Sequence, residues 1–397
     1  MSRTLRVFLC LAAPLAAGIL GFACGGGGPI EVGVVLPLSG RHAIYGAPIH
    51  EGMMVAMETL QADDDLGFQI ALLFEDSGGD PQKAAELAEE LYAQGVPAVI
   101  GGVTTDEALA MVPVADERER VLLSPSASSP RLTGISRNFF RIFPSDFREG
   151  SKMGNFAAQT LGIGRVAIVA AESPYARGIQ DVFKSEFERY GGEVTAVVEY
   201  PPETSDFAPI AEQALEGQPV AVYVADYAQT TAAIVSELRE HDFDGKILAT
   251  SAFASQEAIA QAGRAAEGVL LTQTAMQPDD PTVAAFNEAY ESKYGEQPGI
   301  WAAHGHDAVM VIAEAIKEGG ATPSDLWKGM RSIRNYKLPS GVIQFDEKGD
   351  VSKFPRTYVV ENGALVDYER AVGDKREEIL RRIEELNRAR ARALTNP

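Results

Sequence analysis

The sequence is poor in cysteine, in histidine and in positive charge. It has 2 cysteines and 5 histidines in 397 residues, and Cys10 lies in an apolar N-terminal run that reads as a removable signal. A mature chain would keep Cys24 alone, which excludes a disulfide, a cysteine-rich metal site and a buried cysteine nucleophile. The 35 basic residues are outnumbered by 56 acidic ones, and the formal charge of −21 argues against nucleic-acid partners.

The motifs of nucleotide binding and of hydrolysis are missing too. The sequence has no Walker A segment, no Gly-x-Ser-x-Gly turn and no His-Glu-x-x-His pair, and the glycines of LGIGRVAIVA precede a strand instead of following one. His304 and His306 are close in sequence, but on a helix they point to different faces and would not jointly hold a metal. We therefore expect no enzyme, no cofactor and no metal.

The N-terminus is built like an export signal. Arg3 and Arg6 precede the run VFLCLAAPLAAGIL, which is too short for a comfortable membrane span. The following GFACGGGG resembles a bacterial lipoprotein signal with Cys24 as the acylated residue. We expect residues 1–23 to be a signal peptide and 24–29 a flexible glycine-rich tether, so that the lipid is the only membrane attachment. Ordinary secretion, with Cys24 incidental, is the alternative.

Short apolar runs alternate with helical patterns along most of the chain. IEVGVVLP, FQIALLF and PAVIGG predict buried strands. DPQKAAELAEELYAQG predicts a helix that Asp80 caps, Pro81 begins and Gly95 ends. The alternation restarts after FFRIFPSDF, with strands such as RVAIVAA and PVAVYVAD. This pattern predicts an α/β fold with two doubly wound lobes, each built on a parallel sheet.

The C-terminal part has a different pattern. Asn362 and Gly363, between apolar runs, predict a hairpin. Residues 371–397 predict a charged helix in which pairs such as Glu377 and Arg381 are spaced four apart in the favourable order. Its apolar stripe is thin, so we expect it to lie along the surface; binding of a partner is the alternative.

Hydroxyl side chains gather where two predicted strands end. Thr104 and Thr105 follow VIGG, and Ser126 and Ser128 follow VLL within SPSASSPRL. In an open parallel sheet, ligands bind beyond the carboxyl ends of the strands. Hydroxyls and free amides at helix starts suit a carboxylate or another compact anion. Ordinary caps and turns would explain one such segment, and two together favour a cradle for a small polar ligand. No general base is evident near the serines, which disfavours a serine nucleophile.

Several segments, in order, carry a family resemblance. They are VGVVLPLSGRHAIYG, FEDSGGDPQKAAELAEEL, VIGGVTTDEALAMVPVA, LLSPSASSPRLT, FRIFPSDFREG and GVIQFDEKGD. From about Ile30 to Tyr368 the chain resembles the leucine/isoleucine/valine-binding protein family, the type I periplasmic solute-binding proteins of ABC importers.

The resemblance implies two lobes joined by three crossovers, with the ligand in the cleft between them. The crossovers are expected near residues 140–147, 272–278 and 335–343. The N-terminal lobe would combine 30–141 with 277–336, and the C-terminal lobe 142–276 with 337–370. The charged helix 371–397 would be an addition to this fold.

The resemblance also places ligand contacts on particular residues. The carboxylate-holding hydroxyl falls on Thr105, with Thr104 beside it, and the contacts of SPSAS fall on Ser126 and Ser128. The aromatic residues of the cleft fall on Tyr45, Tyr175 and Tyr227, and His306 stands where the family usually has a tyrosine.

One departure from the family pattern leaves the identity of the ligand undecided. Amino-acid binders of this family commonly place an acid after KILATS to hold the ligand ammonium, but here the chain continues AFAS. Asp226 could replace that acid, since a buried ammonium needs a paired charge, or could simply cap the helix that follows it. An amino acid, an aromatic or aliphatic carboxylate, and an amide are all candidates.

These features predict an extracytoplasmic solute-binding lipoprotein of the periplasm or cell envelope. It would capture a small polar organic ligand by lobe closure and deliver it to an ABC permease. The extra C-terminal helix motivates an alternative, a non-transport ligand sensor or envelope regulatory protein with the same fold. An α/β oxidoreductase is disfavoured by the missing phosphate fingerprint.

Overall fold

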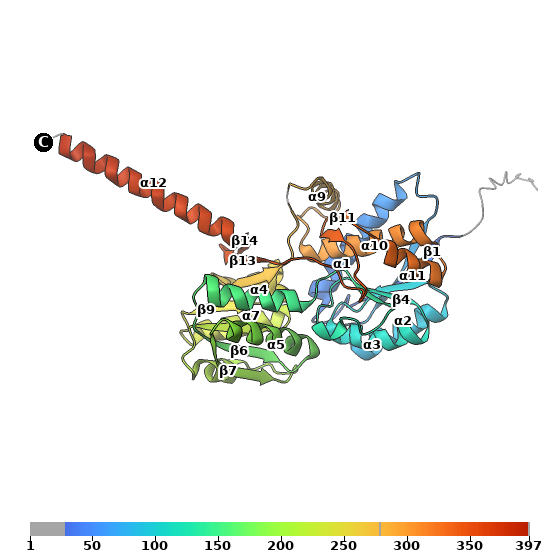
Figure 1. The fold of residues 1–397 in the computed structure, drawn as a ribbon, viewed down its shortest axis with the longest axis horizontal. Helices are drawn as coiled ribbons and strands as arrows, with labels where there is room; N and C mark the ends of the chain where they lie inside the picture. The colour runs from blue at the N-terminus through green and yellow to red at the C-terminus, as the bar shows by residue number, and fades with distance from the viewer. Residues whose placement is uncertain (1–27, 278, 396–397) are drawn as a thin grey trace, which may run out of the picture.

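The computed structural model describes residues 28–277 and 279–395, with 387–395 described by their backbone alone. The expected signal peptide and Cys24, the expected site of acylation, lie outside the described residues. The described part forms two lobes side by side and a long helix that leaves one of them (Figure 1).

The N-terminal lobe is built on a five-stranded parallel sheet in the order β2-β1-β3-β4-β5. Its strands are β1 (Ile30–Leu36), β2 (Ile70–Asp76), β3 (Ala98–Gly101), β4 (Val121–Ser124) and β5 (Phe139–Arg141). Helices α2 (Pro81–Ala93) and α3 (Thr105–Glu117) cover one face, and α1 (Ala43–Gln61) covers the other together with α10 (Ile300–Gly319). Helices α9 (Pro281–Tyr294) and α11 (Pro323–Ser332) pack on α1 and α10 respectively.

Alternating side chains explain these two layers. Val34 and Ile100 face the core shared with α1, whereas Val35 and Val99 face the core shared with α2 and α3. A strand with both faces covered is apolar, as β1 is from Val32 to Leu36, where every residue is buried.

The C-terminal lobe contains a seven-stranded sheet in the order β14-β13-β10-β9-β8-β6-β7. Its strands are β6 (Arg165–Ala171), β7 (Glu193–Tyr200), β8 (Ala221–Ala225), β9 (Lys246–Ala249), β10 (Leu270–Gln273), β13 (Arg356–Glu361) and β14 (Ala364–Asp367). Its helices are α4 (Asp146–Asn155), α5 (Pro174–Arg189), α6 (Ala208–Leu215), α7 (Ala228–Glu240) and α8 (Gln256–Ala262). The last two strands are antiparallel and meet at Asn362 and Gly363, the hairpin that the sequence predicts. The α/β fold with two parallel-sheet lobes is confirmed.

The chain crosses between the lobes three times, and the third crossing is later than expected. After the short strands β11 (Tyr336–Leu338) and β12 (Gly341–Ile343), the chain still contacts the N-terminal lobe. The amide of Ser340 donates to Asp307 at 2.9 Å, and the amide of Arg141 donates to the carbonyl of Gly349 at 3.1 Å. The crossing therefore lies between Val351 and Arg356 and not near 335–343, because Asp350 is bound to Arg141 in the N-terminal lobe.

The C-terminal helix α12 (Tyr368–Thr395) projects away from both lobes (Figure 1). The expectation that it lies along the surface is wrong, because only its first turns pack, against β13 and β14. Ala371 in the first turns is buried, whereas the large apolar side chains that follow it among the described residues are exposed: Val372, Ile379, Leu380, Ile383 and Leu386. Among the described residues, no helix is both long enough and apolar enough to cross a bilayer.

Candidate functional site

A cavity lies between the lobes, at the carboxyl ends of the strands. It is lined by Tyr45, Val103, Thr105, Ser126, Ala127, Ser128, Phe143, Tyr175, Tyr227, Ser251, Ala252 and Trp301. The side chains leave room in it for little more than a water molecule. The lobes are thus closed on each other in this structure.

The strand-to-helix turn after β3 forms one wall of the cavity. Thr104 caps α3: its hydroxyl accepts from the amide of Glu107 at 3.2 Å, and the Glu107 carboxylate accepts from the amide of Thr104 at 2.9 Å. This capping box commits the Thr104 hydroxyl to the helix, so that Thr104 lies outside the cavity lining. Thr105, the first residue of α3, lines the cavity, and its amide donates to the hydroxyl of Tyr227 at 3.3 Å.

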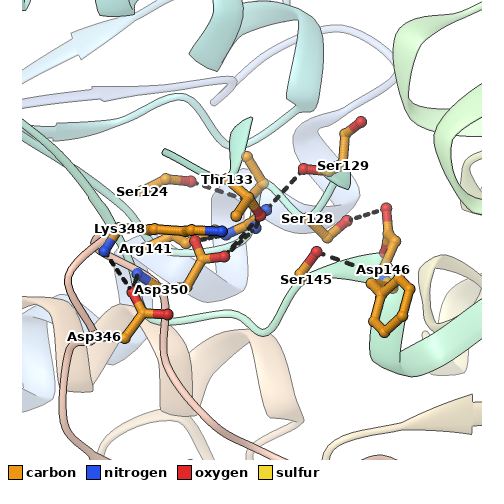
Figure 2. Close-up of polar contacts among 12 residues, drawn as sticks. Ser124, Ser128, Ser129, Thr133, Arg141, Ser145, Asp146, Asp346, Lys348 and Asp350 are labelled. Carbon is orange, nitrogen blue, oxygen red and sulfur yellow. Dashed lines mark hydrogen bonds and ion pairs between the residues drawn. The ribbon is translucent and has the colours of Figure 1, made fainter. Parts of the chain in front are cut away.

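The serine-rich loop after β4 forms the next part of the wall. Ser124 donates to the carbonyl of Gly102 at 2.7 Å, and Ser126 donates to the carbonyl of Val103, also at 2.7 Å. Ser128 donates to the carboxyl of Asp146 at 3.0 Å (Figure 2). These bonds connect the loop to the turn after β3 and to the first crossover, so each of these hydroxyls satisfies a buried acceptor of the chain.

Aromatic rings fill the remaining walls. Tyr227 stacks on Tyr175 with ring centroids 4.7 Å apart, and Tyr45 meets Trp301 edge to face at 5.1 Å. Phe143 stacks on Trp301 at 5.6 Å. The sequence did not identify Phe143 or Trp301 as lining residues. The cluster of phenylalanines in FFRIFPSDF, at an expected crossover, was the signal available for Phe143.

Asp226 and His306 lie outside this cavity, as Thr104 does. The carboxylate of Asp226 accepts from the hydroxyl of Tyr200 at 2.8 Å and from the amide of Tyr227 at 2.7 Å, and burial raises its pKa. It lines a separate pocket nearer the mouth of the cleft, together with Arg41, His42, Thr104 and Asp106.

His306 packs within the N-terminal lobe, with its ring 5.0 Å from that of Phe286 and its Nδ1 3.0 Å from the carboxylate of Asp307. The structure therefore brings six of the nine expected residues into one cavity: Tyr45, Thr105, Ser126, Ser128, Tyr175 and Tyr227.

A buried acid pair that the sequence did not identify lies behind the cavity. Asp146 bonds to Ser128, and Glu149 accepts from the amide of Ser251 at 2.6 Å and from its hydroxyl at 2.7 Å. Burial, together with the neighbouring Glu149, raises the pKa of Asp146 well above its ordinary value. Burial raises the pKa of Glu149 to about 7, although its bonds to Ser251 oppose the shift.

The acid pair predicts how stability depends on pH. The raised pKa of Glu149 gives stability that is present below its ordinary pKa of 4.5 and is lost as pH rises through about 7. We expect the melting temperature of Glu149→Gln to fall less between pH 5 and pH 8 than that of the unchanged protein, measured by circular dichroism. Glu257→Gln, at an exposed position of α8, is the control and should follow the unchanged protein. Equal losses in Glu149→Gln and the unchanged protein would show that Glu149 is not the group responsible.

Comparison with known proteins gives consistent relatives. A family model described as periplasmic binding protein matches residues 29–361. The leucine-, isoleucine-, valine-, threonine- and alanine-binding protein of Pseudomonas aeruginosa is 26% identical over 333 residues, which cover 83% of this chain and 88% of that protein. Leu/Ile/Val-binding protein homolog 1 of Brucella abortus is 26% identical over 353 residues, covering 88% of this chain and 94% of that protein.

A solved structure agrees with the sequence relatives. The crystal structure of a leucine-binding protein from Thermotoga maritima matches with a TM-score of 0.81 and 30% identity, over 85% of this chain and 97% of that one. Such proteins are extracytoplasmic solute-binding components of ABC transporters and not enzymes, as expected from the sequence. The chain therefore belongs to the periplasmic binding protein family, and within it to the leucine/isoleucine/valine-binding group.

Proposed function

We propose that this chain is a lipid-anchored solute-binding protein that captures a small carboxylate or amide ligand, or an amino acid, and delivers it to an ABC importer. The observation that carries the proposal is the cavity between the lobes. Thr105, Ser126 and Ser128 line it from the N-terminal side, and Tyr175, Tyr227 and Ser251 line it from the other. A ligand that contacts both lobes stabilises the closed form, which a permease can recognise.

The donors around the cavity suit a compact anion. The amide of Thr105 stands at the first turn of α3, where backbone N–H groups point outward and the helix dipole favours negative charge. The hydroxyls of Ser126 and Ser128 lie beside it, and each would have to turn from its present acceptor, the carbonyl of Val103 or the carboxyl of Asp146, to donate to the anion. None of the lining residues carries a charge, so that recognition rests on neutral donors. The aromatic walls suit an apolar or planar ligand body.

An ammonium group would need a carboxylate from outside the lining. Asp226 is one candidate, at the mouth of the cleft, and the pair Asp146 and Glu149 is the other, one hydroxyl away behind Ser128 and Ser251. The names of the relatives support an amino acid, whereas the uncharged lining suits a simple carboxylate or an amide directly. A thermal-shift screen against amino acids, carboxylates, amides and sugars would distinguish these classes, because a bound ligand raises apparent stability by mass action.

Fewer observations support the lipid anchor and the delivery to an importer. The apolar run with Arg3 and Arg6 before it, followed by Cys24 and glycines, supports export and acylation. A similar solved structure, from Rhodospirillum rubrum, is named for a branched-chain amino acid ABC transporter, which supports delivery to a permease.

The cradle predicts a loss of affinity in a paired variant. Thr105→Ala with Ser128→Ala should weaken binding of a ligand found in the screen about tenfold or more, since each hydroxyl removed leaves a polar partner unpaired. Isothermal titration calorimetry measures the affinity. Ser236→Ala, which removes a hydroxyl bonded to Ala232 inside α7, is the control and should bind normally. Unchanged affinity in the paired variant would refute the assignment.

The role of Asp226 predicts a selective effect. Asp226→Asn should weaken amine-bearing ligands while leaving simple carboxylates bound, since it removes a charge and keeps the shape of the side chain. Titrations with both ligand classes measure this difference. Tyr200→Phe, which removes the hydrogen bond to Asp226 but not the charge, is the control. An equal loss for both classes would indicate that Asp226 acts only by positioning Tyr227.

A second candidate function, ligand sensing or regulation of an envelope partner, is favoured by α12. Its exposed Ile379, Ile383 and Leu386 lie at i, i+4 and i+7, so they form one stripe along the projecting helix. We expect truncation after Asp367 to leave the uptake of the ligand by cells unchanged, because none of the described residues that line the cavity belongs to α12. Loss of uptake would instead assign α12 to transport.

A further inference from the structure

Two tyrosine hydroxyls cross the cleft in opposite directions. Tyr45 belongs to α1 in the N-terminal lobe, and its hydroxyl lies among atoms of the C-terminal lobe. It accepts from the amide of Ala228 at 2.7 Å and donates to the carbonyl of Ala252 at 3.0 Å. Both the donor and the acceptor capacity of this hydroxyl are therefore used across the cleft, and the side chain is buried, with 4% exposure.

The second tyrosine makes the reverse connection. Tyr227 belongs to the C-terminal lobe, immediately before α7, and its hydroxyl accepts from the amide of Thr105 at the start of α3. Its ring lies against Tyr175 of its own lobe and meets His42 of the other lobe edge to face, with centroids 4.7 Å apart in each case. The ring is thus held by both lobes.

The two connections converge on one short segment. Tyr227 and Ala228 are consecutive, so the start of α7 receives Tyr45 at the amide of Ala228 and extends the Tyr227 side chain to Thr105. Each of these hydrogen bonds joins one lobe to the other. Opening of the lobes therefore breaks both connections together. Two further hydrogen bonds join the lobes: Arg41 donates to the carbonyl of Pro202 at an exposed position, and the hydroxyl of Ser129 donates to the carbonyl of Pro174 at 3.2 Å.

We propose that Tyr45 and Tyr227 form a latch that keeps the lobes shut with the chain's own atoms and sets the threshold that a ligand must overcome. This inference rests on the proposed function, in which the amide of Thr105 serves the ligand. A ligand that uses this amide has to displace the hydroxyl of Tyr227. Tyr45 and Tyr227 are therefore positioning residues for ligand capture, and the lobes exclude small molecules that cannot replace their hydrogen bonds.

The test measures lobe separation without any added ligand. Spin labels at Lys83→Cys and Glu203→Cys report the width of the mouth, since both positions are exposed and adjoin Pro81 and Pro202 of the mouth pocket. The background carries Cys10→Ser and Cys24→Ser so that only these two sites are labelled. Double electron–electron resonance then gives the distribution of distances between the labels.

We expect the protein without these substitutions to give a short distance from the closed lobes and a long distance from the open lobes. In the closed form of Tyr45→Phe, the amide of Ala228 and the carbonyl of Ala252 have lost their partner. In the open form, both groups can bind water. The ratio of long to short distances should therefore rise about tenfold, and further with Tyr227→Phe added. Tyr92→Phe is the matched control, because its buried hydroxyl donates to Val121 within one lobe, and it should leave the distribution unchanged.

The outcomes separate the latch from the proposed function. An unchanged distribution in the double phenylalanine variant overturns the latch, and a shift of the same size in Tyr92→Phe also overturns it, by showing a general loosening. Calorimetry with a ligand from the thermal-shift screen tests the function independently. If the latch acts in the unchanged protein, ligand association in Tyr45→Phe should be faster by the factor by which the open fraction rises.

Discussion

The guanidinium of Arg141 holds together the segments that build the cleft. It is fully buried at the end of β5 and binds both carboxylate oxygens of Asp350, at 2.7 and 2.8 Å (Figure 2). It also donates to the carbonyl of Ser129 at 2.9 Å and to the hydroxyl of Thr133. A buried ion pair is tolerable when its remaining donors also find partners, and here each of the three guanidinium nitrogens makes at least one hydrogen bond. One side chain thereby ties the serine-rich loop to the first and third crossovers.

The hydroxyls of the serine-rich loop serve the chain before they serve any ligand. Ser126 bonds to the neighbouring turn and Ser128 to the first crossover. Such bonds fix the loop in one shape, so the amides and hydroxyls at its surface are preorganised and lose little entropy when they bind. Because these serine hydroxyls donate to acceptors of the chain, they are not nucleophiles and need no general base to activate them. The serines position the backbone and attack no substrate.

Much of the fold could be read from the sequence, because the strands and their caps are local signals. Asp80 and Pro81 begin α2 as expected, and Asn362 and Gly363 form the predicted turn. The third crossing was predicted too early in the chain because its position depends on the pairing of Arg141 with Asp350. These residues lie 209 positions apart, so no local sequence pattern indicates the pair.

The site was predictable where it followed strand ends and not where it depended on packing. Thr105 and Ser128 follow strands directly, and the structure brings them together. Trp301 reaches the cavity from α10, and Glu149 is buried behind it by the packing of α4, so neither had a signal in its own segment. His306 occupied a matching position in the family motif but faces Phe286 in the helix packing. A position in a motif does not determine where a helical side chain points.

The projecting helix alters how the molecule moves through solution. Its 28 residues make a rod of about 42 Å, attached to the rest at one end. Friction depends on the longest dimension more than on mass, so the protein should elute from a sizing column ahead of a spherical protein of 42.5 kDa. An early elution volume therefore reflects shape, and the number of subunits has to come from light scattering or sedimentation equilibrium.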